Sequence, residues 1–310
     1  MAGSPAHPSR PSVVAIFGPT ASGKTAVAEA VADRLEGEVL SADSMQAYQG
    51  LPILTAQPER PTRLVGIWPL AHEGSVAEYA QLAHTAIDEL VAAGRTPVVT
   101  GGTGLYLRAA LAELELPPAP SPEQRAQWEQ VYDRLGPHRA YGVLAQRDPG
   151  AAARLHPNDR RRIVRALELT ELGSSLQPAA DRLWTSDTRR PTVVFGLDVP
   201  RDVLTERIEQ RARSMFTAGV VEEARAALSG PISSTAVQAL GLRDVAELAD
   251  DEAFEALVVR TRRYAAYQRK WMRRIPGLVS VNADRPVDEI THEIVEMASA
   301  RQRLPAGRAG

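Results

Sequence analysis

The stretch AIFGPTASGKTAVAEA, residues 15–30, decides the fold class of this protein. Within it, GPTASGKT matches G-x-x-x-x-G-K-[ST], and it lies between an apolar run at 12–17 and an amphipathic run from Lys24 to about Leu35. A strand, a glycine-rich loop and a helix in this order form a phosphate-binding loop, whose backbone N–H groups and helix N-terminus attract an anion. The pattern predicts a diphosphate site at Gly18, Pro19, Thr20, Ala21, Ser22, Gly23, Lys24 and Thr25, with the Thr25 hydroxyl as a ligand for Mg²⁺.

Strands and helices alternate on both sides of this loop. We expect strands at 12–17, 38–42, 63–67, 96–100, 192–199 and 278–282, and helices at 75–93, 103–112, 201–228, 236–247, 251–274 and 286–301. Alternation of this kind predicts an α/β fold, with a P-loop-type parallel sheet and helices on both faces. A Pro-rich segment at 115–124 is followed by helical stretches only. We therefore predict a core at 12–117 and 186–302, an inserted all-helical domain at 118–185, and disordered ends at 1–11 and 303–310.

Composition limits the chemistry that the chain can perform. The 310 residues include no Cys, which excludes disulfides and thiolate metal sites, and the net charge of −2 requires any nucleic-acid contact to come from a local patch. No apolar run is long enough for a signal peptide or a membrane span, so the sequence predicts a cytoplasmic enzyme. Lys24 and Lys270 are the only lysines among 36 basic residues, which indicates sites that need a compact ammonium ion.

The acid that usually accompanies a phosphate-binding loop is missing from the expected strand. P-loop nucleotidases place an Asp at the end of a second strand to hold Mg²⁺, whereas the strand at 96–100 runs into Gly-Gly-Thr, and Asp198 is placed to cap a helix. Asp43 follows the strand at 38–42. Because ligands bind at the carboxyl ends of parallel strands, we expect Asp43 and Thr103 to face the loop together. Taken alone, Asp43 is equally consistent with the cap of a helix or turn.

Two basic segments are candidates for nucleic-acid contact. Residues 260–274 hold seven Arg or Lys and no acid, with Tyr264, Tyr267 and Trp271 interleaved. Residues 160–165, RRRIVR, form the start of a helix capped by Asn158 or Asp159, and Arg161 and Arg165 share one face of it. For each segment the alternative is a solvated helix face without a partner.

Seven segments resemble, in order and spacing, the motifs of the tRNA dimethylallyltransferase (tRNA isopentenyltransferase) family. They run from about residue 13 to 274 and read GPTASGKT, SADSMQAYQG, GGTGLYLRA, LHPNDRRRIVRALEL, RIEQR, QALGLRD and TRRYAAYQRKWMRR. The resemblance implies transfer of a dimethylallyl (isopentenyl) group from dimethylallyl diphosphate to N6 of the adenosine 3′-adjacent to the anticodon. The loop would then hold the diphosphate of an isoprenoid, with Mg²⁺, and the partners would be this donor and the tRNA anticodon stem-loop, bound by a monomer.

The resemblance also implies roles for individual residues. Asp43 is the expected general base for the attacking amine, Arg211 binds the leaving diphosphate, and Thr20 and Thr103 complete the catalytic set. A solvated helix charge is the alternative for Arg211. The target base must be flipped out of its loop to reach this site. The implied tRNA contacts are Asp43, Ser44, Met45, Gln46, Thr103, Arg125, Arg161, Arg162, Arg165, Gln238, Arg243, Gln268, Arg269, Trp271 and Arg273.

The chain departs from the family pattern after Gly50. Residues 52–58 read PILTAQP where the family usually has DIGTAKP, and residues 61–66 read PTRLVG in place of PHRLLD. The resemblance implies that this region helps to form the allyl and tRNA pocket. A catalytically weakened, tRNA-binding relative is therefore one alternative. Prenyl transfer to free adenine nucleotides, or a small-molecule kinase on the same fold, is the other.

Overall fold

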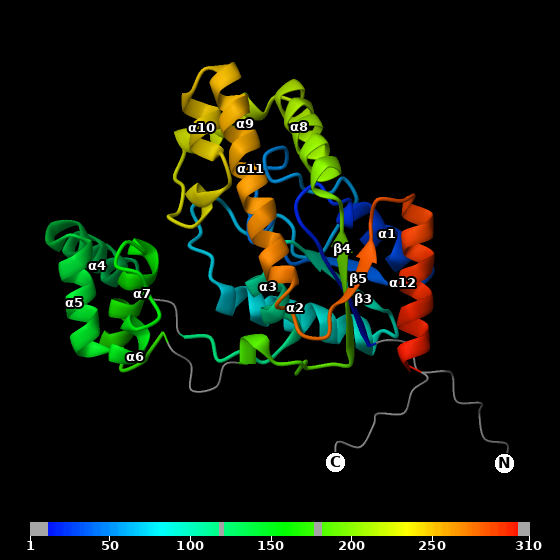
Figure 1. The fold of residues 1–310 in the computed structure, drawn as a ribbon, viewed down its shortest axis with the longest axis horizontal. Helices are drawn as coiled ribbons and strands as arrows, with labels where there is room; N and C mark the ends of the chain where they lie inside the picture. Colours follow the sequence, from blue (N-terminus) through cyan, green and yellow to red (C-terminus); the bar gives the residue numbers. More distant parts are fainter. Residues whose placement is uncertain (1–11, 118–120, 177–181, 303–310) are drawn as a thin grey trace, which may run out of the picture. The chain divides into compact units, whose positions relative to one another are not determined.

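A computed structural model describes residues 12–117, 121–176 and 182–302 of the chain. The predicted disorder at 1–11 and 303–310 lies outside these residues. The chain divides into two compact units, one formed by 1–113 with 183–310 and the other by 114–182 (Figure 1). The inserted domain that we predicted, 118–185, has bounds a few residues different from those of the second unit. No helix in the described part of the chain has the length and apolar character needed to cross a membrane.

The first unit contains a five-stranded sheet in which every neighbouring pair is parallel, in the order β2-β3-β1-β4-β5. This confirms the predicted α/β fold with a parallel sheet. The strands are β1 (Val13–Phe17), β2 (Glu38–Ser41), β3 (Pro97–Gly101), β4 (Thr192–Asp198) and β5 (Val279–Asn282). Because β1 is the central strand of the five, with β3 and β4 on either side, the loop that leaves β1 starts at the middle of the sheet's carboxyl edge.

Helices cover both faces of this sheet. Val14 and Ile16 of β1 belong to one core together with side chains of α1, α8 and α12, whereas Ala15 and Phe17 belong to a second core with α2 and α3. This alternation is the period-2 pattern of a strand buried on both sides. The helices of the first unit are α1 (Lys24–Arg34), α2 (Val76–Ala92), α3 (Gly104–Leu111), α8 (Arg201–Thr217), α9 (Val220–Ser229), α10 (Leu242–Glu247), α11 (Asp250–Met272) and α12 (Val287–Gln302), with short 3₁₀ turns at Arg182–Trp184 and Ala236–Gln238.

Three predictions about these elements are wrong. Residues 63–67 form no strand, because only Arg63 bridges Leu40 and the backbone then turns through positive φ at Leu64 (67°) and Gly66 (61°). The helix predicted at 201–228 is broken at Gly219, whose φ of 93° separates α8 from α9. The helix predicted at 236–247 is divided in the same way at Gly241 (φ 82°), so that only a 3₁₀ turn and the short α10 form there. All three breaks use the left-handed backbone region, which a helix or strand does not enter.

The second unit is a small helical domain with its own core. It contains α4 (Pro122–Leu135), α5 (Pro137–Arg147), α6 (Pro149–Ala152) and α7 (Arg160–Glu171), packed around Trp128, Leu144, Ile163 and Leu167. Asp159 caps α7 by accepting a hydrogen bond from the Arg162 backbone N–H at 3.2 Å. The described residues of this unit form no strand, so its fold depends on helix packing alone.

A buried arginine holds residues 183–187, the segment with which the chain re-enters the first unit. Arg108 on α3 is 1% exposed, and its guanidinium donates hydrogen bonds to the backbone carbonyls of Leu183 (3.0 Å), Thr185 (2.9 Å) and Asp187 (3.2 Å). Burial lowers the pKa of Arg108, an effect that Asp187 opposes. A buried cation must be well hydrogen-bonded to be tolerated, so these carbonyls and Arg108 hold each other in place.

A substitution at Gly101, the last residue of β3, tests how tightly the carboxyl edge of the sheet is packed. A Cβ at this residue would lie 2.3 Å from the carbonyl oxygen of Ala42, which is backbone and cannot move aside. We expect Gly101→Ala to lower the free energy of unfolding by about 1–3 kcal/mol or more, as overpacking does. Gly230→Ala is the matched control, since Gly230 has open space around it and an ordinary φ of −106°. Denaturant unfolding of both variants measures the difference, and equal stability would contradict the steric argument.

Candidate active site

The phosphate-binding loop lies between β1 and α1 and leads into a helix whose N-terminus is not capped by a side chain. Gly23 adopts a left-handed conformation (φ 84°) and Ala21 a positive φ of 63°, so the loop turns sharply before Lys24 begins the helix. No side chain caps α1, and its first turn contains no acid. A helix N-terminus with uncapped N–H groups and no competing carboxylate is suited to an anionic ligand.

Lys24 lies in this loop in a desolvated position. Burial lowers its pKa to about 8, nearby Asp43 opposes the shift, and Arg211 adds to it. Desolvation disfavours the charged form of a lysine, and a second cation disfavours it further. The ammonium group is therefore held beside another positive charge, and an anion bound between the two would be stabilised by both.

Arg211 reaches the loop from α8, far away in the sequence. Its Nη1 donates a hydrogen bond to Thr20 Oγ1 at 2.9 Å. Burial lowers the pKa of the Arg211 guanidinium, and the carboxylate of Asp43 opposes this shift. The predicted alternative, a solvated helix charge, does not describe Arg211, because its head group is buried against the loop.

Gln268 on α11 joins the loop to the end of β3. Its Oε1 accepts a hydrogen bond from the Thr20 backbone N–H at 2.7 Å, and its Nε2 donates to the Gly102 carbonyl at 3.0 Å. The side chain is 1% exposed. We predicted a tRNA contact for Gln268, but both ends of its amide are bonded to protein, so we now assign it a positioning role instead.

Asp43 follows β2, and its carboxylate has two different surroundings. One oxygen accepts a hydrogen bond from the Met45 backbone N–H at 3.0 Å, which closes a turn and realises the capping alternative. The same carboxylate influences the pKa of Lys24, Arg211 and Tyr264, so it lies within electrostatic range of all three. The turn fixes the orientation of the Asp43 carboxylate, which stays within electrostatic range of the phosphate-binding loop.

A group of hydroxyls includes the residue next to Asp43. Thr103 Oγ1 is 3.3 Å from the Tyr264 hydroxyl and 3.5 Å from Ser44 Oγ. Burial raises the pKa of Tyr264, and Asp43 raises it further, so the phenol stays protonated. Asp43 is thus within electrostatic range of the cations of the loop and of this neutral phenol.

The segment after Asp43 is organised by two glutamines. Gln46 accepts a hydrogen bond from Ser41 Oγ at 2.8 Å and donates to the Thr55 and Ala56 carbonyls at 3.3 and 2.9 Å. Gln57 in turn donates to the backbone carbonyl of Gln46 at 3.1 Å. Gln57 occupies the position at which we noted a departure from the family pattern, and it closes this loop through neutral amide contacts.

A cavity of about 40 Å³ opens beside Thr20 and Arg211. Apart from these two residues and Thr261, its lining is apolar and comes from Leu54, Ile208, Ala212, Met215, Leu240 and Leu257. The cavity therefore combines a cationic, hydroxyl-bearing wall with an aliphatic interior.

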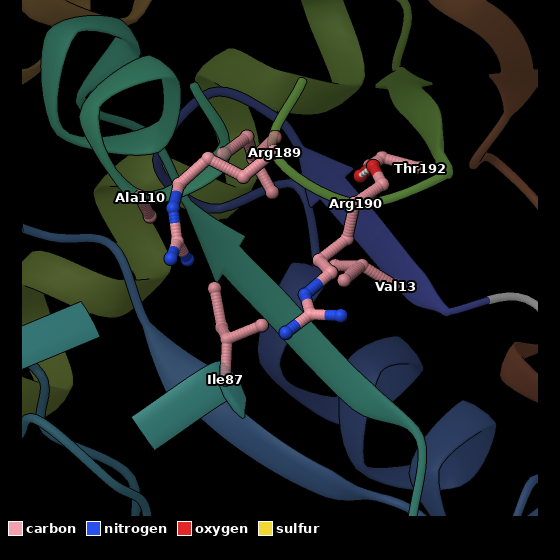
Figure 2. A pocket seen from close by; sticks show the side chains of 7 residues that line it. Val13, Ile87, Ala110, Arg189, Arg190 and Thr192 are labelled. Atoms are coloured by element: carbon pink, nitrogen blue, oxygen red, sulfur yellow. Dashed lines mark hydrogen bonds between the residues drawn. The ribbon is translucent and has the colours of Figure 1, made fainter. Parts of the chain in front are cut away.

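A second pocket is found at the opposite edge of the sheet (Figure 2). It is lined in part by Val13 and Thr192, which begin β1 and β4, so it lies at the amino ends of the strands. Its two cations, Arg189 and Arg190, both pair with Asp88, at 3.0 and 2.9 Å. The groups able to bind a phosphate are at the carboxyl edge, and we place the site there.

Comparison with known proteins gives a consistent result. The sequence model of the family described as IPP transferase matches residues 46–275, and that described as isopentenyl transferase matches residues 11–64. The tRNA dimethylallyltransferase of Corynebacterium jeikeium is 39% identical over 88% of this chain and 92% of its own length, and that of Kineococcus radiotolerans is 41% identical over 93% and 98%. The chain belongs to the tRNA dimethylallyltransferase family.

Solved structures agree with this family assignment. The crystal structure of the full-length tRNA isopentenylpyrophosphate transferase from Bacillus halodurans has 32% sequence identity and a TM-score of 0.68, covering 94% of this chain and 96% of that one. A eukaryotic dimethylallyltransferase acting on tRNA has a TM-score of 0.74 at 22% identity, covering 96% of this chain and 82% of its own, and supports the fold alone. The chain is therefore a member of a family of prenyltransferases.

The structure brings together the residues to which the resemblance to tRNA dimethylallyltransferases gave catalytic roles. These are Thr20, Asp43, Thr103 and Arg211, and the contacts described above also include Lys24, which was predicted to bind the diphosphate. Tyr264 was not among the predicted site residues, although it precedes Gln268 by one helical turn. That spacing on α11 was the available signal, because residues four apart lie on the same face of a helix.

Some of the predicted tRNA contacts on and near α11 are bonded to other protein groups, and others are exposed to solvent. Arg269 is paired with Asp198 at 3.1 Å, and no side chain caps α8, so the predicted capping role of Asp198 is wrong. Trp271 packs against Gly104 and makes a tilted ring contact with Trp184, with 4.8 Å between ring centroids. Arg243 pairs with Glu247 at 3.4 Å on the surface, whereas Gln238 and Arg273 are exposed.

The remaining predicted contacts belong to the second unit. Arg125 and Arg165 both pair with Glu168, at 3.5 and 3.1 Å, and this carboxylate is 1% exposed. Arg161 and Arg162 are exposed. Of the predicted contacts in this unit, two thus contribute to its internal structure, and the other two extend into solvent.

The low pKa of Lys24 predicts a pH dependence of anion binding. A lysine with a pKa of about 8 is charged below that pH and neutral above it. We expect the affinity for inorganic diphosphate to fall as pH rises above 8, by up to about tenfold per pH unit, and titration calorimetry between about pH 7 and 9.5 measures it. Lys24→Arg is the control, because arginine keeps its charge and the ligand's own ionisation is common to both proteins. Identical profiles for the two proteins would contradict the role of Lys24.

Proposed function

We propose that this protein transfers a dimethylallyl group from dimethylallyl diphosphate to N6 of the adenosine 3′-adjacent to the anticodon in tRNA. The observation that carries the proposal is that the Asp43 carboxylate, fixed by the Met45 N–H, lies within electrostatic range of Lys24, Arg211 and Tyr264. A cationic loop suits a departing diphosphate, and a carboxylate beside it suits an amine that must lose a proton. Family membership supports the same reaction.

In the proposed reaction, the bond between the allylic carbon and the diphosphate oxygen breaks, and its electron pair leaves with the diphosphate. The N6 amine forms a new bond to that carbon and passes a proton to Asp43. Negative charge grows on the leaving group as the bond breaks, so Lys24, Arg211 and the loop amides act most strongly in the transition state. Their contribution is electrostatic and requires no covalent intermediate.

We assign the hydroxyl groups to orientation. Thr20 Oγ1 accepts from Arg211 and so holds that guanidinium against the loop. Thr103 and Tyr264 contact each other at 3.3 Å and would offer hydrogen bonds to an adenine edge. A base enclosed there must have left the stack of its own loop, as in other enzymes that modify bases.

Mg²⁺ fits this loop as an ion shared with the diphosphate. Ser22 Oγ is buried and has no hydrogen-bond partner, Thr25 lies in the first turn of α1, and the described residues include no cluster of three or more His, Cys, Asp or Glu that could hold a metal alone. Mg²⁺ characteristically binds through few protein oxygens together with substrate phosphates and water. We propose Thr25 as its protein ligand, where the ion would neutralise charge on the diphosphate.

We propose that α11 supplies a surface for the tRNA anticodon stem-loop. Arg263, Lys270 and Arg273 are exposed and have no ion-pair partner within the described part of the chain, and Tyr267 is 54% exposed between the first two. Exposed cations interleaved with aromatic rings suit the phosphates and splayed bases of single-stranded RNA. Arg161 and Arg162 offer similar charges on the second unit. A monomeric state and a cytoplasmic location stay predictions.

A transfer assay tests the proposed reaction and the role of Asp43. With donor labelled in the prenyl group and undermodified tRNA, we expect label in tRNA. Asp43→Asn should lower kcat by about 10²–10⁴-fold, the usual contribution of a general base, and leave the Kd for the stem-loop little changed. The asparagine retains an acceptor for the Met45 N–H, so the turn is preserved. Asp202→Asn, an exposed acid on α8, is the control.

The other outcomes of this assay are equally informative. Label in free AMP, ADP or ATP, with none in tRNA, would replace the proposal by nucleotide prenylation. No label in either acceptor would favour a tRNA-binding relative without activity. Normal turnover by Asp43→Asn would remove it as the base.

Salt dependence tests the proposed tRNA surface. Each phosphate contact that is lost should reduce the slope of log Kd against log salt by about 0.7–0.9. We expect Arg263→Ala, Lys270→Ala and Arg273→Ala each to weaken binding of the stem-loop and to reduce this slope. Arg262→Ala is the matched control on the same helix, because Arg262 is already paired with Glu209. Equal slopes for Arg262→Ala and Arg263→Ala would contradict the assignment.

A further inference from the structure

The cavity beside Arg211 has a composition that suits one end of the proposed donor. Thr20 and Arg211, joined by their 2.9 Å hydrogen bond, form its polar wall, and Leu54, Ile208, Met215 and their aliphatic neighbours form the rest. A molecule with a diphosphate at one end and a branched hydrocarbon at the other would contact both walls at once. Neither a nucleoside nor a sugar phosphate has an apolar group to match this interior.

We infer that Leu54 limits the length of the hydrocarbon tail that this cavity accepts, so that a five-carbon donor is used and a ten-carbon donor is rejected. The inference rests on the proposed function, since it takes the cavity to be the site of the donor's tail. It adds a specificity-determining residue that has no role in binding the diphosphate or moving the proton.

The size of the cavity supports a limit near five carbons. Its volume of about 40 Å³ holds about three water-sized groups, at roughly 10–15 Å³ for each. The branched end of a dimethylallyl group consists of one carbon and two methyls, which matches this capacity. A geranyl tail has five further carbons and would have to displace part of the lining.

The backbone at Leu54 is held in place by a carboxylate. Its backbone N–H donates to Glu223 Oε1 at 2.7 Å, and the N–H of Ile53 donates to Glu223 Oε2 at 2.8 Å. Both oxygens of one carboxylate on α9 therefore hold this segment, and charged hydrogen bonds of this kind are strong. The Leu54 side chain is 6% exposed and packs into the main core of the first unit.

Met215 lines the cavity from α8 and is 8% exposed. A methionine side chain is flexible and adapts its shape to a neighbour. Leu54 therefore sets the limit, whereas Met215 offers a second, independent way to enlarge the cavity.

The test compares dimethylallyl and geranyl diphosphate as donors, with the anticodon stem-loop as acceptor. We expect Leu54→Ala to raise the ratio of kcat/KM for geranyl over dimethylallyl diphosphate at least about tenfold, the discrimination that one or two methylenes give in an apolar pocket. Leu54→Phe should raise the KM for dimethylallyl diphosphate. Leu51→Ala is the matched control, because Leu51 is 1% exposed in the same segment and does not line the cavity.

Met215→Ala keeps the test decisive if Leu54→Ala fails to fold, since it should change the ratio in the same direction. Suppose that the wild type is active on dimethylallyl diphosphate and that the variants that fold show an unchanged ratio of kcat/KM for the two donors. That result would overturn the role of Leu54 and leave the proposed function intact. If the wild type transfers no prenyl group, equilibrium binding of the two donors without tRNA decides the matter. A gain in the affinity of Leu54→Ala for geranyl relative to dimethylallyl diphosphate would support the proposed role of Leu54. An unchanged ratio of affinities would reject it.

Discussion

The site depends on one buried amide. Gln268 of α11 accepts from the backbone of Thr20 and donates to the backbone of Gly102, so a single side chain ties a helix, the phosphate-binding loop and the end of β3 together. A buried amide left without partners is strongly unfavourable, so the two hydrogen bonds are kept or lost together with the local fold. A side chain at Gly102 would displace this amide, since a Cβ there would lie 2.1 Å from Gln268 Nε2. The distance between the cationic loop and Tyr264 is set by this contact.

The fold was largely predictable because its determinants are local. The strand, glycine-rich loop and helix at 13–34 are encoded in consecutive residues, and alternating apolar runs located the five strands that form. The errors occur where a few dihedral angles decide the outcome. Residues 63–67 have the composition of a strand, but positive φ at Leu64 and Gly66 turns the chain away after one bridge. Gly219 divides α8 from α9 in the same manner. Composition does not report which residues adopt such angles.

The site was predictable in its residue types but not in its pairings. The resemblance singled out Asp43, Thr103 and Arg211, and the structure places them around the loop. It could not separate the basic residues that are free from those that are neutralised, because the acids concerned are distant in sequence. Arg269 is neutralised by Asp198, and Arg165 by the buried Glu168. A count of charges along α11 or α7 therefore overstates the charge available to a polyanion.

The desolvated ammonium of Lys24 has a consequence beyond ligand attraction. Near pH 8, Lys24 is uncharged in about half of the molecules, and the uncharged amine is nucleophilic. This amine lies inside the loop that would bind the anion. The sequence contains just one other lysine. Reagents that modify amines, such as activated esters or aldehydes, would thus have few other lysine side chains in this protein to react with. A diphosphate mimic that carries such a group has, in this loop, the chemistry needed for selective covalent inhibition.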